Sequence, residues 1–159
     1  MKLHLVTVGQ KMPAWVEQGY HEYARRMPPE AALMTHEIAL QKRPKQMSHT
    51  VLKRLMDKEG QQMLMAVPDN AYCVALEIEG RSLSTEQLAK RLLHWSQQSA
   101  NIALLIGGPE GLAESCRQRA HESWSLSALT LPHPMVRVIV AEALYRAWTF
   151  NQGHPYHRT

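Results

Sequence analysis

The chain has 159 residues, of which 45% are hydrophobic and 20% are charged, and this composition excludes a disordered chain. Its length suits one domain with a single core, and its formal net charge of +4 is compatible with a nucleic-acid partner but too mild to indicate one alone. No stretch approaches the ~20 apolar residues of a membrane span, and the start, MKLHLVTVGQK, lacks the apolar run and cleavage site of a signal peptide. We therefore expect a cytoplasmic protein that does not bind membranes.

Patterns of apolar residues predict two strands and two helices in the first part of the chain. The β-rich run LHLVTVG (residues 3–9) predicts a strand, and helical spacing after it predicts a helix that the pair Pro28-Pro29 ends. The run LMTHEIAL (33–40) predicts the second strand, and a basic loop, QKRPKQ, follows it. The second helix is predicted from about residue 48 to 66, with four apolar side chains facing inward: Leu52, Leu55, Met56 and Met63.

Two further strands and a helix are predicted in the middle of the chain. The run AYCVALEI (71–78) predicts the third strand, closed by Gly80. Ser84 and Gln87 fit a capping box at the start of the next helix. The near-continuous apolar run NIALLIGG (101–108) is typical of a strand buried on both faces.

The last part of the chain predicts a short helix from about residue 112 to 121 and a fifth strand over WSLSALTL (124–131). Pro134 opens the last helix, which carries Glu142 and Arg146 four residues apart on its outer face. Its apolar stripe consists of Val136, Ile139, Val140, Ala143, Leu144 and Ala147. Strand and helix thus alternate five times, which indicates an α/β fold with a mostly parallel sheet and helices on its faces.

Ligands bind outside the carboxyl ends of the strands in such sheets, and two of these ends have unusual chemistry. In LLIGGPEGL (104–112), glycines would let the backbone approach a ligand closely, although the run is neither a Walker A loop nor G-x-G-x-x-G. In SLSALTLPHP (125–134), small polar residues precede two prolines, and such a rigid loop could offer backbone groups to an adenine. A tight strand-to-helix turn and an edge strand with a proline-ended turn are equally good interpretations.

The end of the chain, NQGHPYHRT, concentrates polar chemistry just after the last predicted helix. His154 and His157 are proton acceptors three residues apart, but no third metal ligand is evident nearby, so we expect no metal. The segment is either a frayed polar tail or part of a site.

The cysteines and the absence of known catalytic motifs narrow the possible classes of enzyme. Cys73 and Cys116 have no metal or redox spacing and lie among apolar or helical neighbours, so we expect buried thiols in a reducing compartment. No Ser-His-Asp signature is present, and there is no H-E-x-x-H motif.

Three stretches, taken in order, carry a family resemblance: LLIGGPEGL, SWSLSALTLPHPMVRVIVAEALYRAW and HPYHR. Together with MKLHLVTVGQKMPAWV and VALEIEG, they resemble the ribosomal large-subunit RNA methyltransferase H family, a branch of the SPOUT methyltransferases. The resemblance spans essentially the whole chain and is densest from Leu104 to Arg158.

The resemblance implies a single SPOUT methyltransferase domain over residues 1–159, an α/β fold with a C-terminal trefoil knot, and a homodimer. It also implies that the methyl donor, S-adenosylmethionine, binds in the knot. Carried over to this sequence, the pocket would consist of Leu76, Gly108, Ser127, Ala128, Leu129, Thr130, Leu131 and Pro132.

The substrate implied by the resemblance is a pseudouridine in large-subunit rRNA, methylated at N3 on assembled ribosomes. In the implied dimer, the tail of one subunit lies beside the cofactor of the other. The tail then provides four candidate catalytic residues: His154, Tyr156, His157 and Arg158.

A hypothesis for the chemistry follows from these residue types. His154 or His157 could accept the N3 proton, and such general-base help is typically worth ~10²–10⁴-fold. Arg158 could stabilise negative charge on the base or hold a phosphate, and Tyr156 could stack on the base or donate to it. Candidates for phosphate contacts elsewhere are Arg25, Arg26, Lys42, Arg43 and Lys45, whose alternative interpretation is a solvated charged surface.

Two other functions stay open at this level. A non-catalytic ribosome-binding assembly factor on the same fold would bind ribosomes and transfer no methyl group. A nucleotide-binding α/β enzyme would hold a phosphate in the glycine loop, although no lysine follows the glycines and no carboxylate pattern suggests Mg²⁺.

Overall fold

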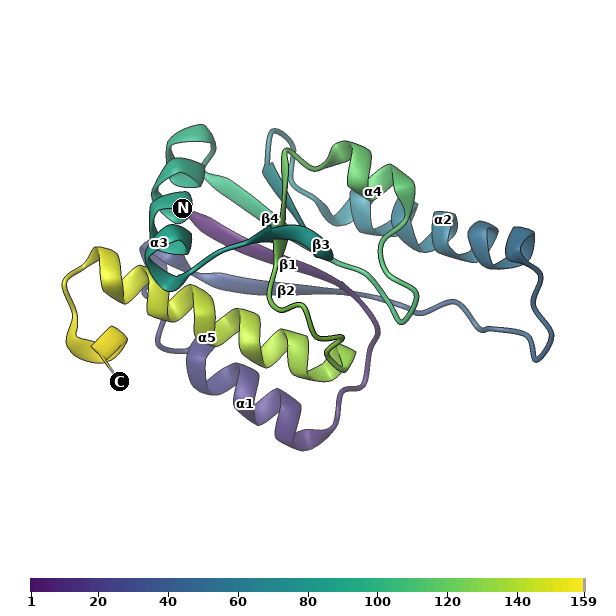
Figure 1. The fold of residues 1–159 in the computed structure, drawn as a ribbon, viewed down its shortest axis with the longest axis horizontal. Coiled ribbons are helices and arrows are strands. Elements are labelled where there is room, and N and C mark those ends of the chain that lie inside the picture. Colours follow the sequence, from purple (N-terminus) through teal and green to yellow (C-terminus); the bar gives the residue numbers. More distant parts are fainter. Residues whose placement is uncertain (159) are drawn as a thin grey trace.

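Five parallel strands form one sheet in the order β2-β1-β4-β3-β5 (Figure 1). The computed structural model describes residues 1–158, so Thr159, the last residue of the predicted domain, lies outside the described residues. Strand β4, which is apolar and buried from Ile102 to Ile106, lies at the centre of the sheet, and this confirms the prediction of a strand buried on both faces. The strands are β1 (Lys2–Val8), β2 (Leu33–Ile38), β3 (Tyr72–Ser82), β4 (Asn101–Ile106) and β5 (Glu122–Ser125).

Helices cover both faces of the sheet, and side chains alternate between two cores because strand residues point to opposite faces in turn. Leu3 and Leu5 pack with α1, α3 and α5 on one face, whereas Val6 and Val8 pack with α2 and α4 on the other. The helices are α1 (Ala14–Ala24), α2 (His49–Ala66), α3 (Thr85–Gln98), α4 (Glu114–Arg119) and α5 (His133–Asn151), with short 3₁₀ turns η1 (Pro29–Ala31) and η2 (Pro155–Arg158).

Most local predictions from the sequence are confirmed. The capping box of α3 is present, since Ser84 accepts from the amide of Gln87 and the Gln87 side chain accepts from the amide of Ser84. Both Cys73 and Cys116 are free, fully buried thiols, and burial raises the pKa of Cys116 to about 11. In the described part of the chain, the helices are too short or too polar to cross a membrane.

The third strand does not end at Gly80 but continues to Ser82. Its pairing with β5 shifts register between Leu76 and Arg81, and Gly80 lies where a Cβ atom would approach the backbone carbon of Trp124 to 2.8 Å. This glycine therefore permits a close approach of two backbones rather than ending the strand.

The fifth strand is shorter than predicted, ending at Ser125 instead of residue 131. The Ser125 hydroxyl donates to the Ser127 carbonyl (3.1 Å), and the Leu129 amide donates to the Ser127 hydroxyl (2.9 Å). These local bonds replace ladder bonds, so the chain leaves the sheet and residues 126–132 form a loop above it.

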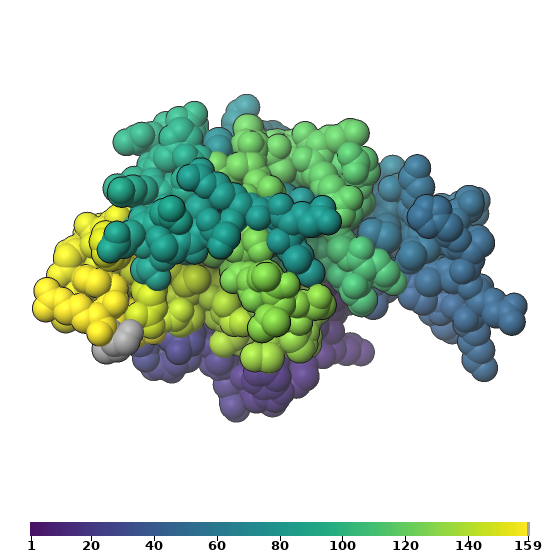
Figure 2. All heavy atoms as spheres, viewed as in Figure 1, coloured from purple at the N-terminus to yellow at the C-terminus, as the bar shows by residue number. Residues whose placement is uncertain are grey.

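The predicted inward face of α2 is wrong in part. Met63 is buried, but Leu52, Leu55 and Met56 are only half-buried because the start of α2 projects beyond the sheet, as Figures 1 and 2 show. Gly60 makes the closest approach instead, where a Cβ atom would lie 2.6 Å from the Cβ of Ala113 at the start of α4.

Candidate functional site

A cavity of about 880 Å³ opens at the carboxyl ends of β3, β4 and β5. Three segments line it, namely residues 76–79 in β3, residues 106–112 after β4, and the released loop that follows β5 into the first turn of α5. This is the edge at which open parallel sheets bind ligands, and both unusual strand ends noted in the sequence meet there.

Seven of the eight residues predicted to hold the cofactor line this cavity. They come from β3, the glycine turn and the loop after β5, which the chain separates by up to 56 positions. Ala128 is exposed and lies outside the lining formed by the described residues. The seven that line it are Leu76, Gly108, Ser127, Leu129, Thr130, Leu131 and Pro132.

The glycine-rich run forms a tight turn that is also a wall of the cavity. The Gly111 amide donates to the Gly108 carbonyl (3.0 Å), and Gly111 has a positive φ of 93°. A Cβ atom on Gly107 would lie only 2.2 Å from the Gly111 carbonyl oxygen, so only glycine fits there. The two interpretations of this run, a tight turn and a ligand loop, are therefore compatible.

Carboxylates outnumber cations around the cavity. Glu77, Glu79 and Glu110 line it, and among the described lining residues only Arg117 carries a fixed positive charge, which is paired with Glu77. His133 also lines it, and burial, followed by the nearby Arg137, lowers its pKa, so it is neutral at pH 7. Such a lining favours a cationic ligand over a polyphosphate.

The start of α5 is fixed to the sheet by a buried arginine. Arg137 donates to the Gly9 carbonyl (2.7 Å) and to the Glu37 carboxylate (2.6 Å), at the carboxyl ends of β1 and β2. Its side chain is only 5% exposed. This contact holds the first turn of α5, and with it His133, against the cavity.

The tail folds back along α5, from its end to its middle. The Tyr156 hydroxyl donates to the Glu142 carboxylate (3.1 Å), and its ring lies 4.7 Å from that of Tyr145. Burial, followed by Glu142, raises the pKa of Tyr156 to about 12, so the phenol stays protonated. The ring of His157 contacts Phe150, with centroids 5.0 Å apart.

The predicted catalytic residues are therefore brought together with each other but not with the cavity. His154, Tyr156, His157 and Arg158 lie in or beside η2, whereas the cavity borders the first turn of α5 (Figure 1). The Tyr156 hydroxyl reaches Glu142, which lies nine residues along α5 from His133, or about 14 Å at a rise of ~1.5 Å per residue. Within residues 1–158, no group of three or more His, Cys, Asp or Glu is placed to hold a metal ion.

The basic residues proposed for phosphate contacts divide into two groups. Arg25 and Arg26 both pair with Glu22 on α1, and Arg43 pairs with Glu59 and Glu110. Lys42 and Lys45 are exposed on the projecting loop before α2.

Sequence reasoning missed the charged lining of the cavity. Glu110 stands within the glycine run, and Glu77 and Glu79 directly follow the apolar part of the third strand, so their position after strand ends was the available signal. The pairing of Arg43 with Glu59 and Glu110 leaves no local signal, because the partners are 16 and 67 positions away.

Comparison with known proteins agrees with this geometry. The family model described as "Predicted SPOUT methyltransferase" matches residues 1–157, which gives the class of protein. A relative from Methylococcus capsulatus (strain ATCC 33009 / NCIMB 11132 / Bath), named ribosomal RNA large subunit methyltransferase H, is 56% identical over 99% of this chain and 100% of its own length. A relative of the same name from Hahella chejuensis (strain KCTC 2396) is 51% identical over 99% of each chain. The chain therefore belongs to the ribosomal RNA large subunit methyltransferase H family of SPOUT methyltransferases, as the sequence motifs had indicated.

A solved structure shares the fold at much lower sequence similarity. A methylase family protein from Haemophilus influenzae Rd KW20 superposes with a TM-score of 0.54 at 12% identity, covering 98% of this chain and 69% of that one. At this identity the likeness shows the fold alone.

Proposed function

We propose that this protein transfers a methyl group from S-adenosylmethionine to N3 of a pseudouridine in large-subunit rRNA, acting as a homodimer on assembled ribosomes in the cytoplasm. The observation that carries the proposal is the acidic cavity at the carboxyl ends of β3, β4 and β5, lined by seven of the residues expected to hold the donor. The two relatives named ribosomal RNA large subunit methyltransferase H support rRNA as the acceptor.

The residues around the cavity fit S-adenosylmethionine. A volume of about 880 Å³ is within the ~300–1,000 Å³ range of small-molecule sites. Leu76, Ile106 and Leu131 provide apolar surface for an adenine, and the adjoining loop backbone offers donors and acceptors. Of the three lining carboxylates, Glu77 is paired with Arg117 and Glu110 with Arg43, whereas Glu79 has no ion pair among the described residues and favours the positive charges of the sulfonium and the amino group.

We further propose that the whole chain is one SPOUT domain whose C-terminal part forms a trefoil knot around this cavity. The position of β3 between β4 and β5 supports this, because it places the segment leaving β5 against the turn leaving β4. Both segments line one cavity, as a knotted donor site requires.

A homodimer is supported by the distance between the cavity and the tail. No tail residue lines the cavity of its own subunit, and the Tyr156 hydroxyl is held at Glu142, about 14 Å along α5 from His133, so the tail of one subunit would serve the cavity of another. Large apolar side chains near the cavity and at the starts of α1 and α5 are also exposed, as expected of a surface that a second copy covers: Trp15, Ile78, Leu129 and Met135.

In the proposed reaction, bound S-adenosylmethionine supplies a methyl group on a positively charged sulfur, which leaves as a neutral thioether. The pseudouridine N3 forms the new bond to the methyl carbon and gives up its proton. Aligning N3 with the methyl–sulfur bond is the main task of the residues around the cavity.

The tail geometry favours His157 over His154 as the acceptor of that proton. The Tyr156 amide donates to Nδ1 of His154 (3.1 Å), so neutral His154 carries its proton on Nε2 and presents a donor. His157 accepts no such bond among the described residues, and its Nδ1 is buried without a hydrogen-bond partner there, which leaves Nε2 as the nitrogen to take the proton. Arg158 would stabilise negative charge on the carbonyl oxygens that flank N3, and protonated Tyr156 would stack on the base or donate to it.

The test is transfer of labelled methyl from S-adenosylmethionine to ribosomes from cells lacking this protein, with the modified nucleoside identified by mass spectrometry. N3-methylpseudouridine in large-subunit rRNA is the expected product. Donor binding without any labelled rRNA would contradict the substrate, and binding to ribosomes without donor binding would indicate an assembly factor instead.

A further inference from the structure

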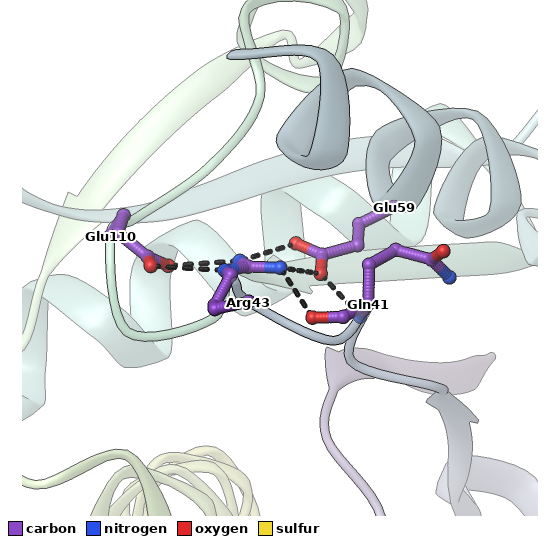
Figure 3. A network of polar contacts seen from close by, with 4 residues as sticks. All are labelled: Gln41, Arg43, Glu59 and Glu110. Carbon is purple, nitrogen blue, oxygen red and sulfur yellow. Dashed lines mark hydrogen bonds and ion pairs between the residues drawn. The ribbon is translucent and has the colours of Figure 1, made fainter. Parts of the chain in front are cut away.

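A single guanidinium joins three segments of the chain beside the cavity (Figure 3). Arg43 donates from Nη1 to Glu59 (2.6 Å) and to the Gln41 carbonyl (2.8 Å), from Nη2 to Glu59 (3.1 Å) and Glu110 (3.0 Å), and from Nε to Glu110 (3.1 Å). These bonds use all five N–H donors of the side chain. Arg43 is therefore held in one place.

The fixed side of this junction is α2. Glu59 is buried, with its side chain 5% exposed, and it also accepts from the Gln41 amide (2.7 Å). Its two oxygens take a bidentate pair from Arg43, which is the strongest and most directional geometry for these groups. Arg43 and the loop that carries it are thus anchored to the helix.

The other side of the junction is the wall of the cavity. Glu110 stands at the tip of the turn that the Gly111 amide closes on the Gly108 carbonyl. The Glu110 side chain is 28% exposed, and Arg43 lowers the pKa of its carboxyl group, mainly through their hydrogen bonds. Arg43 itself does not line the cavity, so it acts there through Glu110.

We propose that Arg43 is a positioning residue, which fixes the glycine turn as a wall of the methyl-donor cavity by holding Glu110 against α2. This inference rests on the proposed function, since it names the donor as the ligand of that cavity. Donor affinity then depends on a basic residue 67 positions away from the turn it holds.

Positioning and simple electrostatics predict opposite results for the same change. Loss of Arg43 makes the cavity more negative, which alone would strengthen binding of a cationic donor. Loss of the anchored turn weakens binding of any ligand in the cavity. The product S-adenosylhomocysteine, which lacks the sulfonium charge but keeps the amino and carboxylate groups, separates the two, because it responds to the turn as the donor does and much less to the charge.

The experiment compares Glu110→Ala with Glu79→Ala in the full chain. Both variants remove one carboxylate from the cavity lining, but only the first breaks the contact with Arg43 and leaves the pair of Arg43 with Glu59 intact. Calorimetry measures the Kd of S-adenosylmethionine and of S-adenosylhomocysteine, and amide hydrogen exchange measures the opening of the turn at Gly111. The third variant is Arg43→Lys, which keeps the positive charge but loses the planar guanidinium that makes the bidentate pair.

We expect Glu110→Ala to weaken both ligands by roughly tenfold and to speed Gly111 exchange by a similar factor, since breaking two charge-assisted bonds loosens the turn. Arg43→Lys should lie between this variant and wild type. Glu79→Ala should weaken S-adenosylmethionine alone and leave Gly111 exchange unchanged.

Unchanged exchange at Gly111 in Glu110→Ala would overturn the positioning role. A loss of affinity limited to the cationic ligand would overturn it in favour of charge. If wild type binds neither ligand, the proposed function fails, and Gly111 exchange in Glu110→Ala still decides whether Arg43 holds the turn.

Discussion

At its start, α5 borders a cavity lined by one chain, whereas its second half carries a tail whose reactive side chains line no part of that cavity. The cavity end is acidic, and its histidine, His133, is kept neutral by burial. The tail presents two histidines, a protonated tyrosine and an arginine. Under the proposed function, donor binding and acceptor chemistry are thus built at separate parts of one helix.

Under the proposed function, this separation makes the subunit a complete donor-binding unit but an incomplete catalyst. The two ends can therefore be disabled independently, and each change below should affect one end while leaving the other intact.

Removing the tail should have the largest effect. Truncation before His154 takes away the proposed proton acceptor and the arginine, so methyl transfer should fall by at least about a thousandfold. Donor affinity should stay within about twofold of wild type, because the tail does not line the cavity of its own subunit. Single-turnover assays with ribosomes and calorimetry measure the two quantities, and normal turnover by the truncated protein would exclude a catalytic tail.

Distorting the cavity wall should act in the opposite way. Gly108→Leu places a side chain whose Cβ would lie 3.3 Å from Val8 and 3.4 Å from Leu40, so these neighbours or the glycine turn that walls the cavity must shift. We expect donor affinity to fall by about tenfold or more, with the tail and the dimer unaffected. Calorimetry measures the affinity for S-adenosylmethionine, and the molecular mass in solution checks that the dimer is intact. Unchanged affinity would mean that the donor binds elsewhere.

Mixing the two defective proteins should restore activity. In a dimer of one truncated and one Gly108→Leu subunit, the intact cavity of the first meets the intact tail of the second. After random exchange, half of the dimers are mixed and each has one working site of two, so about a quarter of the wild-type rate should return. No recovery, with subunit exchange verified by mass spectrometry, would mean that each tail serves its own cavity.

The smallest effect is on stability, and it has opposite pH dependence at the two ends. The pKa of His133 is lowered in the folded protein, so the unfolded chain binds the proton first and stability falls as the pH drops below ~6.5. The pKa of Tyr156 is raised to about 12, so stability falls only as the pH rises from ~10 through 12. Urea unfolding measures the free energy of unfolding between pH 7.5 and 5.5. This free energy should fall less in His133→Asn than in wild type, and its dependence on pH should be the same in Tyr156→Phe as in wild type.

Local signals explain why much of the fold could be predicted from the sequence. The capping residues of α3, the apolar run of β4 and the alternation of strands and helices are short-range patterns, and the structure contains all of them. The fifth strand was overestimated because WSLSALTL has a strand-like composition, while the bonds of Ser125 and Ser127 that remove it from the sheet depend on side-chain geometry.

The site was predicted less completely because its parts are non-local. The seven lining residues follow from the resemblance and from the rule that ligands bind at strand ends, but the acidic character of the lining follows from neither. From the sequence, Arg43 is a candidate for a phosphate contact or a solvated surface charge, because a basic loop gives no indication of carboxylates 16 and 67 positions away. Nor does any periodicity specify how far the tail lies from the cavity, since that distance depends on the direction in which α5 packs.

The anchoring of α5 by Arg137 has a geometric consequence for catalysis. The helix is held to β1 and β2 at Arg137, and about 21 Å of helix extends from there to its end at Asn151. A tilt of about 10° at the anchored end would displace the end of α5, and the tail joined to it, by about 4 Å, more than the length of a hydrogen bond. Under the proposed function, the ion pair between Arg137 and Glu37, which touches no reacting atom, would therefore set the accuracy with which each subunit delivers its tail to the other.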